Sequence, residues 1–247
     1  MPSEEYYDGR NLESNSMLFE TLNEYFKFDS LDSSGGTTTK TDIIGNQHGV
    51  TTHFSLKYAS GSNTQVHLPT LYSMAEQLCM PKTIFEKLDK FLGTNDVAQW
   101  YTWIRDHVPD QTEKRYQRIL SHHIADWNSV VDWFNVNNKK LAQLLLQKLE
   151  TQNPIQYLIW ANKKKGGIQL IDVNKFITYI DQYCRWITMP KGTVLRCQRL
   201  DTQKPIFFMQ MKNSGGPPGG YNRSPQFHLC SNWPNQLVVY EKTNIRF

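Results

Sequence analysis

The spacing of the apolar residues changes along the chain, and this change constrains the fold more than any other feature. Residues 41–58 and the region after Pro154 contain short strand-like runs, whereas residues 69–150 carry apolar side chains three and four positions apart. The first pattern is typical of β-strands and the second of amphipathic helices. A chain with a helical middle between two strand-rich parts is expected to adopt a mixed α+β fold.

The same pattern predicts individual elements. Residues 9–27 are expected to form an amphipathic helix, and the Ser/Gly/Thr-rich residues 30–39 a loop. Two strands are expected at 41–44 and 50–58, separated by the turn residues Gly45–Gly49, with a polar loop at 59–64. Further helices are predicted at 69–92, 112–134, 137–150 and 172–184, and further strands at 155–161, 168–171, 193–200, 205–212, 226–229 and 237–240.

The domain organisation is predicted to be simple. The 247 residues contain no internal repeat and no long linker, and they suffice for one sizeable core. We therefore expect a single domain over 1–247, with an N-terminal part at about 9–70, a helical middle at 71–150 and a β-rich part at 155–247. The four cysteines form no C-x-x-C pair, which favours reduced thiols and no zinc module.

Charge is distributed unevenly. Residues 1–32 hold eight acidic and two basic residues and so carry a net charge of −6. The total is +4, so residues 33–247 carry +10. Residues 185–223 contain seven Lys or Arg and one acid. This asymmetry suits either a polyanionic partner or a mildly basic enzyme. No apolar run is long enough to span a bilayer and residues 1–8 do not resemble a secretory signal, so a cytoplasmic protein without a membrane partner is expected.

One segment has the residue types needed for phosphodiester hydrolysis. Asp42 opens the first predicted strand, and Ser55 and Lys57 lie two apart on the next, so their side chains share one face. A carboxylate can hold Mg²⁺ against a phosphate oxygen, while a lysine orients or deprotonates the attacking water. An Asp and a Lys on neighbouring strands also fit a simple surface ion pair. Walker, Rossmann and G-x-S-x-G motifs are missing, so nucleotide hydrolysis, dinucleotide binding and α/β-hydrolase chemistry lack support.

Neighbouring residues extend this pattern. Glu13 on the first predicted helix, Asp42 and the Ser55-x-Lys57 strand follow one another as in the PD-(D/E)xK nuclease superfamily. The polar segment 60–66 and the C-terminal segments 210–216 and 223–229 resemble parts of the MspI-like type II restriction endonucleases, which cut four-base sites. The resemblance covers nearly the whole chain, though each motif is weak alone.

The resemblance implies a restriction-endonuclease-like α/β core, with a central mixed sheet flanked by helices, and a role for each site residue. Asp42 would be the central metal ligand, Glu13 a second metal carboxylate and Lys57 the catalytic lysine. Ser55 stands where the family has Glu, Gln or Asn. A hydroxyl is a poorer Mg²⁺ ligand than a carboxylate or amide oxygen. Ser55 would therefore act through water, or the carbonyl of Leu56 would supply coordination, or the site would be weakly active or inactive.

Side chains suited to contacting base edges lie in two segments, one just after Lys57 and one near the C-terminus. Lys and Arg match guanine, and Asn and Gln match adenine. The predicted DNA-binding residues are Ser62, Asn63, Gln65, Lys212, Asn213, Ser214, Asn222, Arg223 and Gln226.

The sequence thus predicts a sequence-specific double-strand DNA endonuclease that depends on Mg²⁺, with Mn²⁺ as a substitute and Ca²⁺ as a non-productive ion. A cognate DNA methyltransferase is expected if the protein is a restriction enzyme. A free-standing homing or nicking endonuclease of the same superfamily, and a non-catalytic DNA-binding protein with a decayed site, are the alternatives. Whether the protein acts as a monomer or a homodimer stays open.

Overall fold

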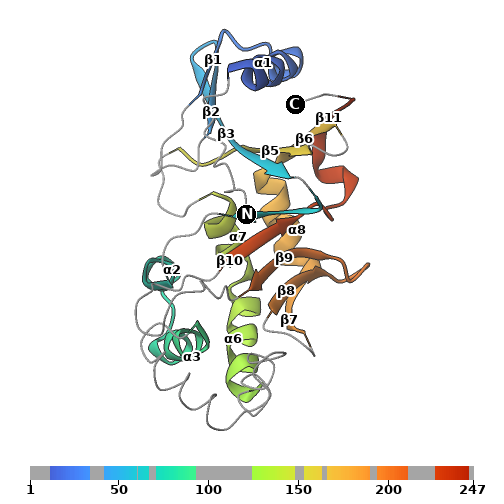
Figure 1. Cartoon of the computed structure of the whole chain (residues 1–247). Coiled ribbons are helices and arrows are strands. Elements are labelled where there is room, and N and C mark those ends of the chain that lie inside the picture. The colour runs from blue at the N-terminus through green and yellow to red at the C-terminus, as the bar shows by residue number, and fades with distance from the viewer. Residues whose placement is uncertain are drawn as a thin grey trace, which may run out of the picture. The chain divides into compact units, whose positions relative to one another are not determined.

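The computed structural model describes residues 12–33, 42–59, 61–66, 71–92, 124–147, 153–162, 166–189, 194–210 and 226–244 (Figure 1). Contacts between Cα atoms divide the chain into two compact units. Unit 1 comprises residues 1–64, 146–177 and 233–247, and unit 2 comprises residues 65–145 and 178–232. The prediction of a single domain stays a prediction.

Unit 1 is built on a six-stranded mixed sheet. Its strands lie in the order β1 (Ser30–Ser33), β2 (Ile43–Gln47), β3 (Val50–Ala59), β5 (Tyr157–Asn162), β6 (Gly167–Asp172) and β11 (Val238–Thr243). All neighbours are antiparallel except β3 and β5, which run parallel. A parallel pair needs a long connection. Here the whole chain between residues 60 and 156 separates the two strands.

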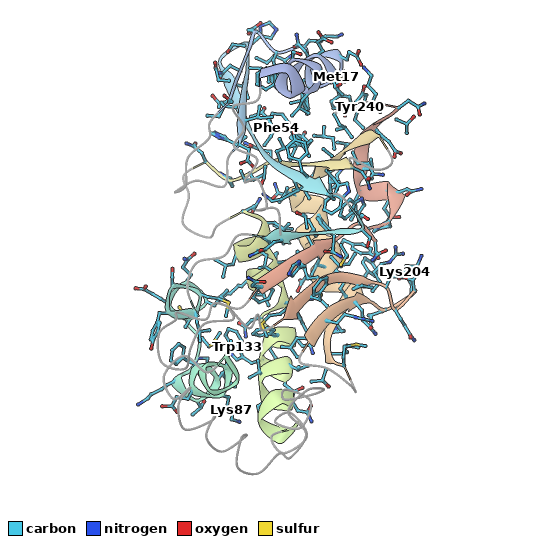
Figure 2. The ribbon with its side chains drawn as sticks, viewed as in Figure 1. Met17, Phe54, Lys87, Trp133, Lys204 and Tyr240 are labelled. Carbon is cyan, nitrogen blue, oxygen red and sulfur yellow. The ribbon has the colours of Figure 1, made fainter. Side chains whose placement is uncertain are left out.

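Helix α1 (Leu12–Phe26) covers one face of this sheet. Leu18 and Leu22, four residues apart on the helix, pack with Phe54, Ile159 and Leu170 from three strands. Phe54, labelled in Figure 2, is fully buried in this cluster. The end of α1 is tied to the last strand, because Lys242 donates a hydrogen bond of 2.7 Å to Glu24.

The second face of the same sheet carries the alternate side chains. Trp160 packs edge-on against Trp233, which also contacts Phe176 at the start of α8 (Val173–Tyr183). Asp172 caps that helix by accepting a hydrogen bond from the backbone N–H of Lys175. The sheet of unit 1 is therefore flanked by α1 on one face and by the first turns of α8 with Trp233 on the other.

Unit 2 contains a five-stranded sheet and most of the helices. Its strand order is β4 (Asn63–Val66), β10 (Gln226–Cys230), β9 (Pro205–Gln210), β8 (Val194–Arg199) and β7 (Cys184–Thr188). The helices are α2 (Leu71–Gln77), α3 (Lys82–Leu92), α6 (Ile124–Val136) and α7 (Asn138–Leu146). A short 3₁₀ helix, η1 (Asn235–Leu237), belongs to unit 1.

An aromatic cluster joins α6 to the sheet of unit 2. Phe134 packs against Trp186 of β7 and Phe227 of β10, with ring centroids 5.2 and 6.5 Å away. Asn138 is 1% exposed, and its side chain makes hydrogen bonds to three neighbouring groups. Its amide donates to the carbonyls of Ile180 and Cys184 and accepts from the indole N–H of Trp186. One buried side chain thus joins α7, α8 and β7.

Several predicted boundaries need correction. The helix expected over 69–92 is two helices within the described residues, because Cys79 has a φ of 50° and Pro81 removes a backbone donor. Residues 30–33 of the expected loop form β1, and β4 and β7 were not predicted. Parts of the predicted helix at 112–134 and of the strand at 205–212 lie outside the described residues.

The predicted fold class is confirmed: the chain is α+β, with a central mixed sheet flanked by helices. All four cysteines are free thiols, and Cys184, Cys197 and Cys230 are buried. Within the described ranges, no helix has the length and apolar character that crossing a membrane requires.

Candidate active site

The β2–β3 hairpin brings Asp42, Ser55 and Lys57 to one face of the sheet in unit 1. The tight turn is closed by His48 and Gly49, both with positive φ, and Ile43 pairs with Phe54 across the hairpin. Ile43 and Phe54 point into the core under α1. Side chains alternate along a strand, so Asp42, Ser55 and Lys57 point to the opposite face.

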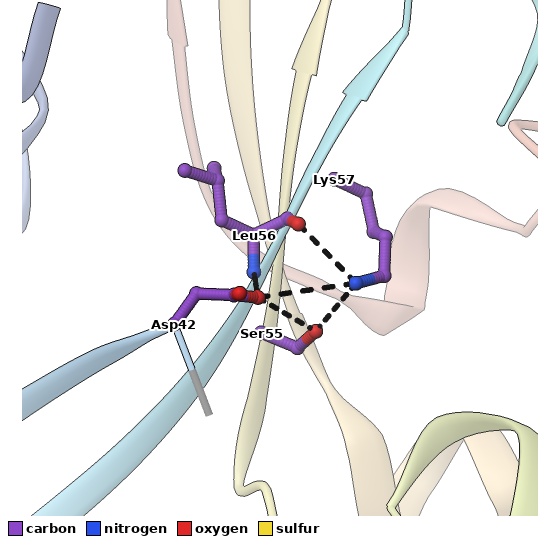
Figure 3. Close-up of polar contacts among 4 residues, drawn as sticks. All are labelled: Asp42, Ser55, Leu56 and Lys57. Atoms are coloured by element: carbon purple, nitrogen blue, oxygen red, sulfur yellow. Dashed lines mark hydrogen bonds and ion pairs between the residues drawn. The ribbon is translucent and has the colours of Figure 1, made fainter. Parts of the chain in front are cut away.

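The three side chains form a continuous polar network (Figure 3). Lys57 Nζ donates to Ser55 Oγ at 2.8 Å, and Ser55 Oγ donates to Asp42 Oδ2 at 3.2 Å. Asp42 Oδ2 also accepts the backbone N–H of Leu56 at 2.6 Å and lies 3.9 Å from Lys57 Nζ. The hydroxyl of Ser55 therefore bridges the carboxylate and the amine, and the predicted convergence of positions 42 and 57 is observed.

Lys57 lies in a partly desolvated environment. Its side chain is 22% exposed, against 39% for Asp42. Burial lowers the pKa of Lys57 below its ordinary value, and the carboxylate of Asp42 opposes this effect. Lys57 thus loses its proton more readily than a solvated lysine, which is the property of lysines that act as bases.

His53 and Gln156 also belong to this region, although the sequence did not single them out. His53 precedes Ser55 by two residues on β3 and shares its face, and burial lowers the pKa of its imidazole. The side-chain oxygen of Gln156 accepts the backbone N–H of His53 at 2.6 Å, and its backbone N–H donates to the His53 carbonyl at 3.0 Å. Gln156 thereby fixes β3 against the start of β5. Only the strand pairing, which links residues 103 positions apart, reveals it.

The donors present around Asp42 fit a hard cation. The carboxylate of Asp42, the hydroxyl of Ser55 and the carbonyl of Leu56 are all oxygens, and Mg²⁺ often takes one or two carboxylates beside water and phosphate. The Leu56 carbonyl also accepts from Lys57 Nζ at 3.3 Å. Glu13 lies within α1, but its side chain is outside the described residues. Among the side chains that the structure describes, no three His, Cys, Asp or Glu gather as a metal cluster would require.

The predicted DNA-binding residues are only partly described. Ser62 lies just before β4, Asn63 and Gln65 lie on β4, and all three are exposed. Gln226 is partly exposed at the start of β10. Lys212, Asn213, Ser214, Asn222 and Arg223 lie outside the described residues.

Two solved structures are similar to the chain. The restriction endonuclease MspI in complex with its cognate DNA aligns over 88% of this chain and 77% of its own, at 11% identity and a TM-score of 0.48. HhaI endonuclease in complex with DNA aligns over 92% of this chain and 94% of its own, at 12% identity and a TM-score of 0.33. No known family and no curated protein matches the sequence.

Proposed function

We propose that this chain is a Mg²⁺-dependent, sequence-specific endonuclease that hydrolyses phosphodiester bonds in double-stranded DNA. The observation that carries the proposal is the convergence of Asp42, Ser55 and Lys57, with Asp42 Oδ2 and Lys57 Nζ 3.9 Å apart. A carboxylate and an amine of lowered pKa on one half-exposed sheet face are the groups that in-line attack of water on phosphorus requires.

Lys57 is proposed to assist the attacking water. In its neutral form the amine accepts a proton from water as the oxygen bonds to phosphorus, the P–O3′ bond breaks, and the departing O3′ takes a proton from solvent water. The products would carry a 5′-phosphate and a 3′-hydroxyl. In its protonated form the same group would offset negative charge on the phosphate oxygens. Ser55 holds the amine on the Asp42 side through its 2.8 Å hydrogen bond.

Mg²⁺ is the proposed cofactor because the oxygen donors fit it. Asp42 and the Leu56 carbonyl would hold the ion, Ser55 would act directly or through water, and Glu13 would contribute a second carboxylate. When bound, the ion supplies positive charge that stabilises the phosphate oxygens in the transition state. Mn²⁺ should substitute, whereas Ca²⁺ should support binding without cleavage.

Digestion of plasmid DNA tests the proposal. With Mg²⁺, the purified chain should yield discrete fragments whose sequenced ends share one short site. Lys57→Ala and Asp42→Asn should each reduce cleavage by about 10²–10⁴-fold, the range for a positioned acid–base group. Lys140→Ala, an exposed lysine on α7, serves as the matched control. Unspecific smearing, or undiminished cutting by both site variants, would defeat the proposal.

Two alternatives would leave different traces. Ends that share a long, degenerate sequence would favour a free-standing homing or nicking endonuclease. A gel shift with Ca²⁺ and no cleavage with Mg²⁺ or Mn²⁺ would favour a DNA-binding protein without catalysis. The second alternative is supported by Ser55 and by the single carboxylate described at the site. A restriction role would further require a cognate methyltransferase to protect host DNA.

A further inference from the structure

The five strands of the sheet in unit 2 carry a strongly one-signed charge. They contain three arginines, Arg185, Arg196 and Arg199, and neither Asp nor Glu. The strands of the other sheet, by contrast, carry both signs, with three acidic residues, Asp32, Asp172 and Glu241, and two lysines, Lys57 and Lys242. A positive field concentrated on one sheet is the electrostatic signature of an anionic partner.

The two faces of this sheet differ in character. Trp186, Cys197, Phe207 and Phe227 alternate onto the apolar face, where each is at most 2% exposed. The opposite face carries Arg185, Arg196, Phe208, Gln226 and His228, and we call it the polar face. Gln226, already predicted to contact DNA from the sequence, therefore shares a face with residues that the sequence did not single out.

Strand register aligns three of these residues in a row. Arg196 of β8 pairs with Phe208 of β9, which pairs with His228 of β10. The rings of Phe208 and His228 stack with centroids 4.5 Å apart and planes 4° from parallel. The row thus presents a guanidinium beside two flat, stacked rings.

The three arginines of the sheet are not equivalent. Arg199 forms an ion pair and two hydrogen bonds with Asp201 and donates to the Asn232 carbonyl. Arg185 donates to the carbonyls of Asp181 and Cys184. Arg196 is partly buried, and its Nε is shielded from solvent without an acceptor in the described part of the chain.

Cys230, a described neighbour of Arg196, does not supply a counter-charge. Burial raises the pKa of the nearby Cys230 thiol to about 11, although the positive charge of Arg196 acts in the opposite direction. The thiol is therefore neutral at physiological pH. A shielded guanidinium nitrogen without an acceptor destabilises the folded state, and an anionic ligand that accepts from it removes that cost.

We propose that the polar face of this sheet binds the sugar–phosphate backbone of duplex DNA, with the guanidinium of Arg196 donating to a phosphate. Phe208 and His228, stacked on one another, lie beside it in the row. This inference rests on the proposed function, since the substrate class is the one inferred from the Asp42–Lys57 site. It adds a binding surface in unit 2 to a chemical site in unit 1. A phosphate, rather than a base edge, is assigned because the positive charge of Arg196 and Arg185 attracts the backbone of DNA of any sequence.

The test compares duplex binding by full-length wild type, Arg196→Met and Lys140→Met, measured by fluorescence anisotropy in Ca²⁺ at several salt concentrations. Methionine keeps much of the arginine stem and removes the charge. Arg196→Met should raise Kd about tenfold for specific and random duplexes alike, and lower the slope of log K against log salt by about 1. Lys140 is exposed on α7, the helix whose Asn138 accepts a hydrogen bond from Trp186. Lys140→Met should change neither Kd nor the salt slope.

A stability measurement separates a binding role from a structural one. Because the Nε of Arg196 has no acceptor among the described residues, Arg196→Met should unfold at the same or a higher urea concentration than wild type. If Arg196→Met binds duplex DNA with wild-type affinity while wild type cleaves DNA, the inference is overturned and the proposed function stands. Loss of affinity for one sequence only would replace the phosphate with a base edge and overturn it too. If wild type binds no duplex, both proposals fall together.

Discussion

At the scale of single residues, Ser55 decides how the candidate site works. The family pattern places a Glu, Gln or Asn there, and the sequence left open whether a hydroxyl weakens the site. In the structure the hydroxyl accepts from Lys57 and donates to Asp42. A residue that is a poor metal ligand thus acts as a link between the carboxylate and the amine.

Replacing Ser55 tests that link. Ser55→Ala removes a hydrogen bond to each of two charged groups, and bonds of this kind are worth about 1.5–3 kcal/mol. We expect the rate of DNA cleavage at saturating Mg²⁺ to fall about 10- to 100-fold. Ser55→Asn, which restores an amide typical of the family, should recover activity and lower the Mg²⁺ concentration needed for half-maximal cleavage. Wild-type kinetics in Ser55→Ala would show that the bridge has no catalytic role.

The buried amine of Lys57 predicts a pH dependence of stability. Its pKa is lowered in the folded state, so above that value the unfolded chain binds more protons and stability rises with pH until the ordinary lysine pKa. Lys57→Met removes this contribution. In urea unfolding, the variant should gain stability relative to wild type near neutral pH, because it no longer carries a desolvated amine. The gain should shrink as the pH approaches 10, whereas a difference independent of pH would contradict the assigned desolvation. Lys140→Met provides the matched series.

At the scale of elements, the β2–β3 hairpin depends on a close contact with Phe28. A Cβ at Gly45 would lie 2.7 Å from ring atoms of Phe28, whose ring packs against Phe54. Only glycine therefore lets β2 approach that ring, and β2 leads directly from Asp42.

Gly45→Ala should consequently destabilise the protein by about 1–3 kcal/mol, the usual cost of overpacking. Equilibrium unfolding measures the loss. The double variant Phe28→Leu/Gly45→Ala should lose less than the two single variants together, because the smaller side chain makes room. Gly61→Ala is the control, since a Cβ there would meet nothing within 4 Å. Strictly additive losses would argue against the contact.

In unit 2 the corresponding structural residue is Asn138. Asn138→Ala would leave the Trp186 indole N–H and the carbonyls of Ile180 and Cys184 without this partner in a buried site. We expect a loss of about 2–4 kcal/mol in the free energy of unfolding. The neighbouring Asn137→Ala removes only a bond to Trp133 one turn earlier and should cost under about 1 kcal/mol. Equal effects of the two variants would refute the role of Asn138.

The elements predicted from the sequence were those with a clear local period. Helices α1, α7 and α8 and strands β3, β5 and β6 fall close to their expected ranges. Strands β1, β4 and β7 were not predicted because they are only four or five residues long. In addition, β1 and β4 are mostly polar, and β7 directly follows a helix. The break between α2 and α3 was not predicted because the helical spacing of apolar residues continues across Cys79. The positive φ of Cys79 ends the first helix.

At the scale of the whole molecule, the candidate site was predictable and the polar face was not. Asp42, Ser55 and Lys57 come from one hairpin, so strand alternation and the family resemblance suffice to bring them together. Arg196, Phe208 and His228 come from three strands that are only paired in the fold. No local pattern marks their shared face. Division of the chain into two units was likewise invisible, because both units contain segments from distant parts of the sequence.

The central claim is that Asp42 and Lys57 act on the same scissile phosphate. The most direct measurement is single-turnover cleavage, started by adding Mg²⁺ to protein–DNA complexes assembled in Ca²⁺. Wild type should cleave in one exponential phase, while Asp42→Asn and Lys57→Ala should bind with near-wild-type affinity and cleave at least about 100-fold more slowly. A wild-type complex that binds DNA without cleaving it, or a Lys57→Ala complex that cleaves at the wild-type rate, would contradict the account.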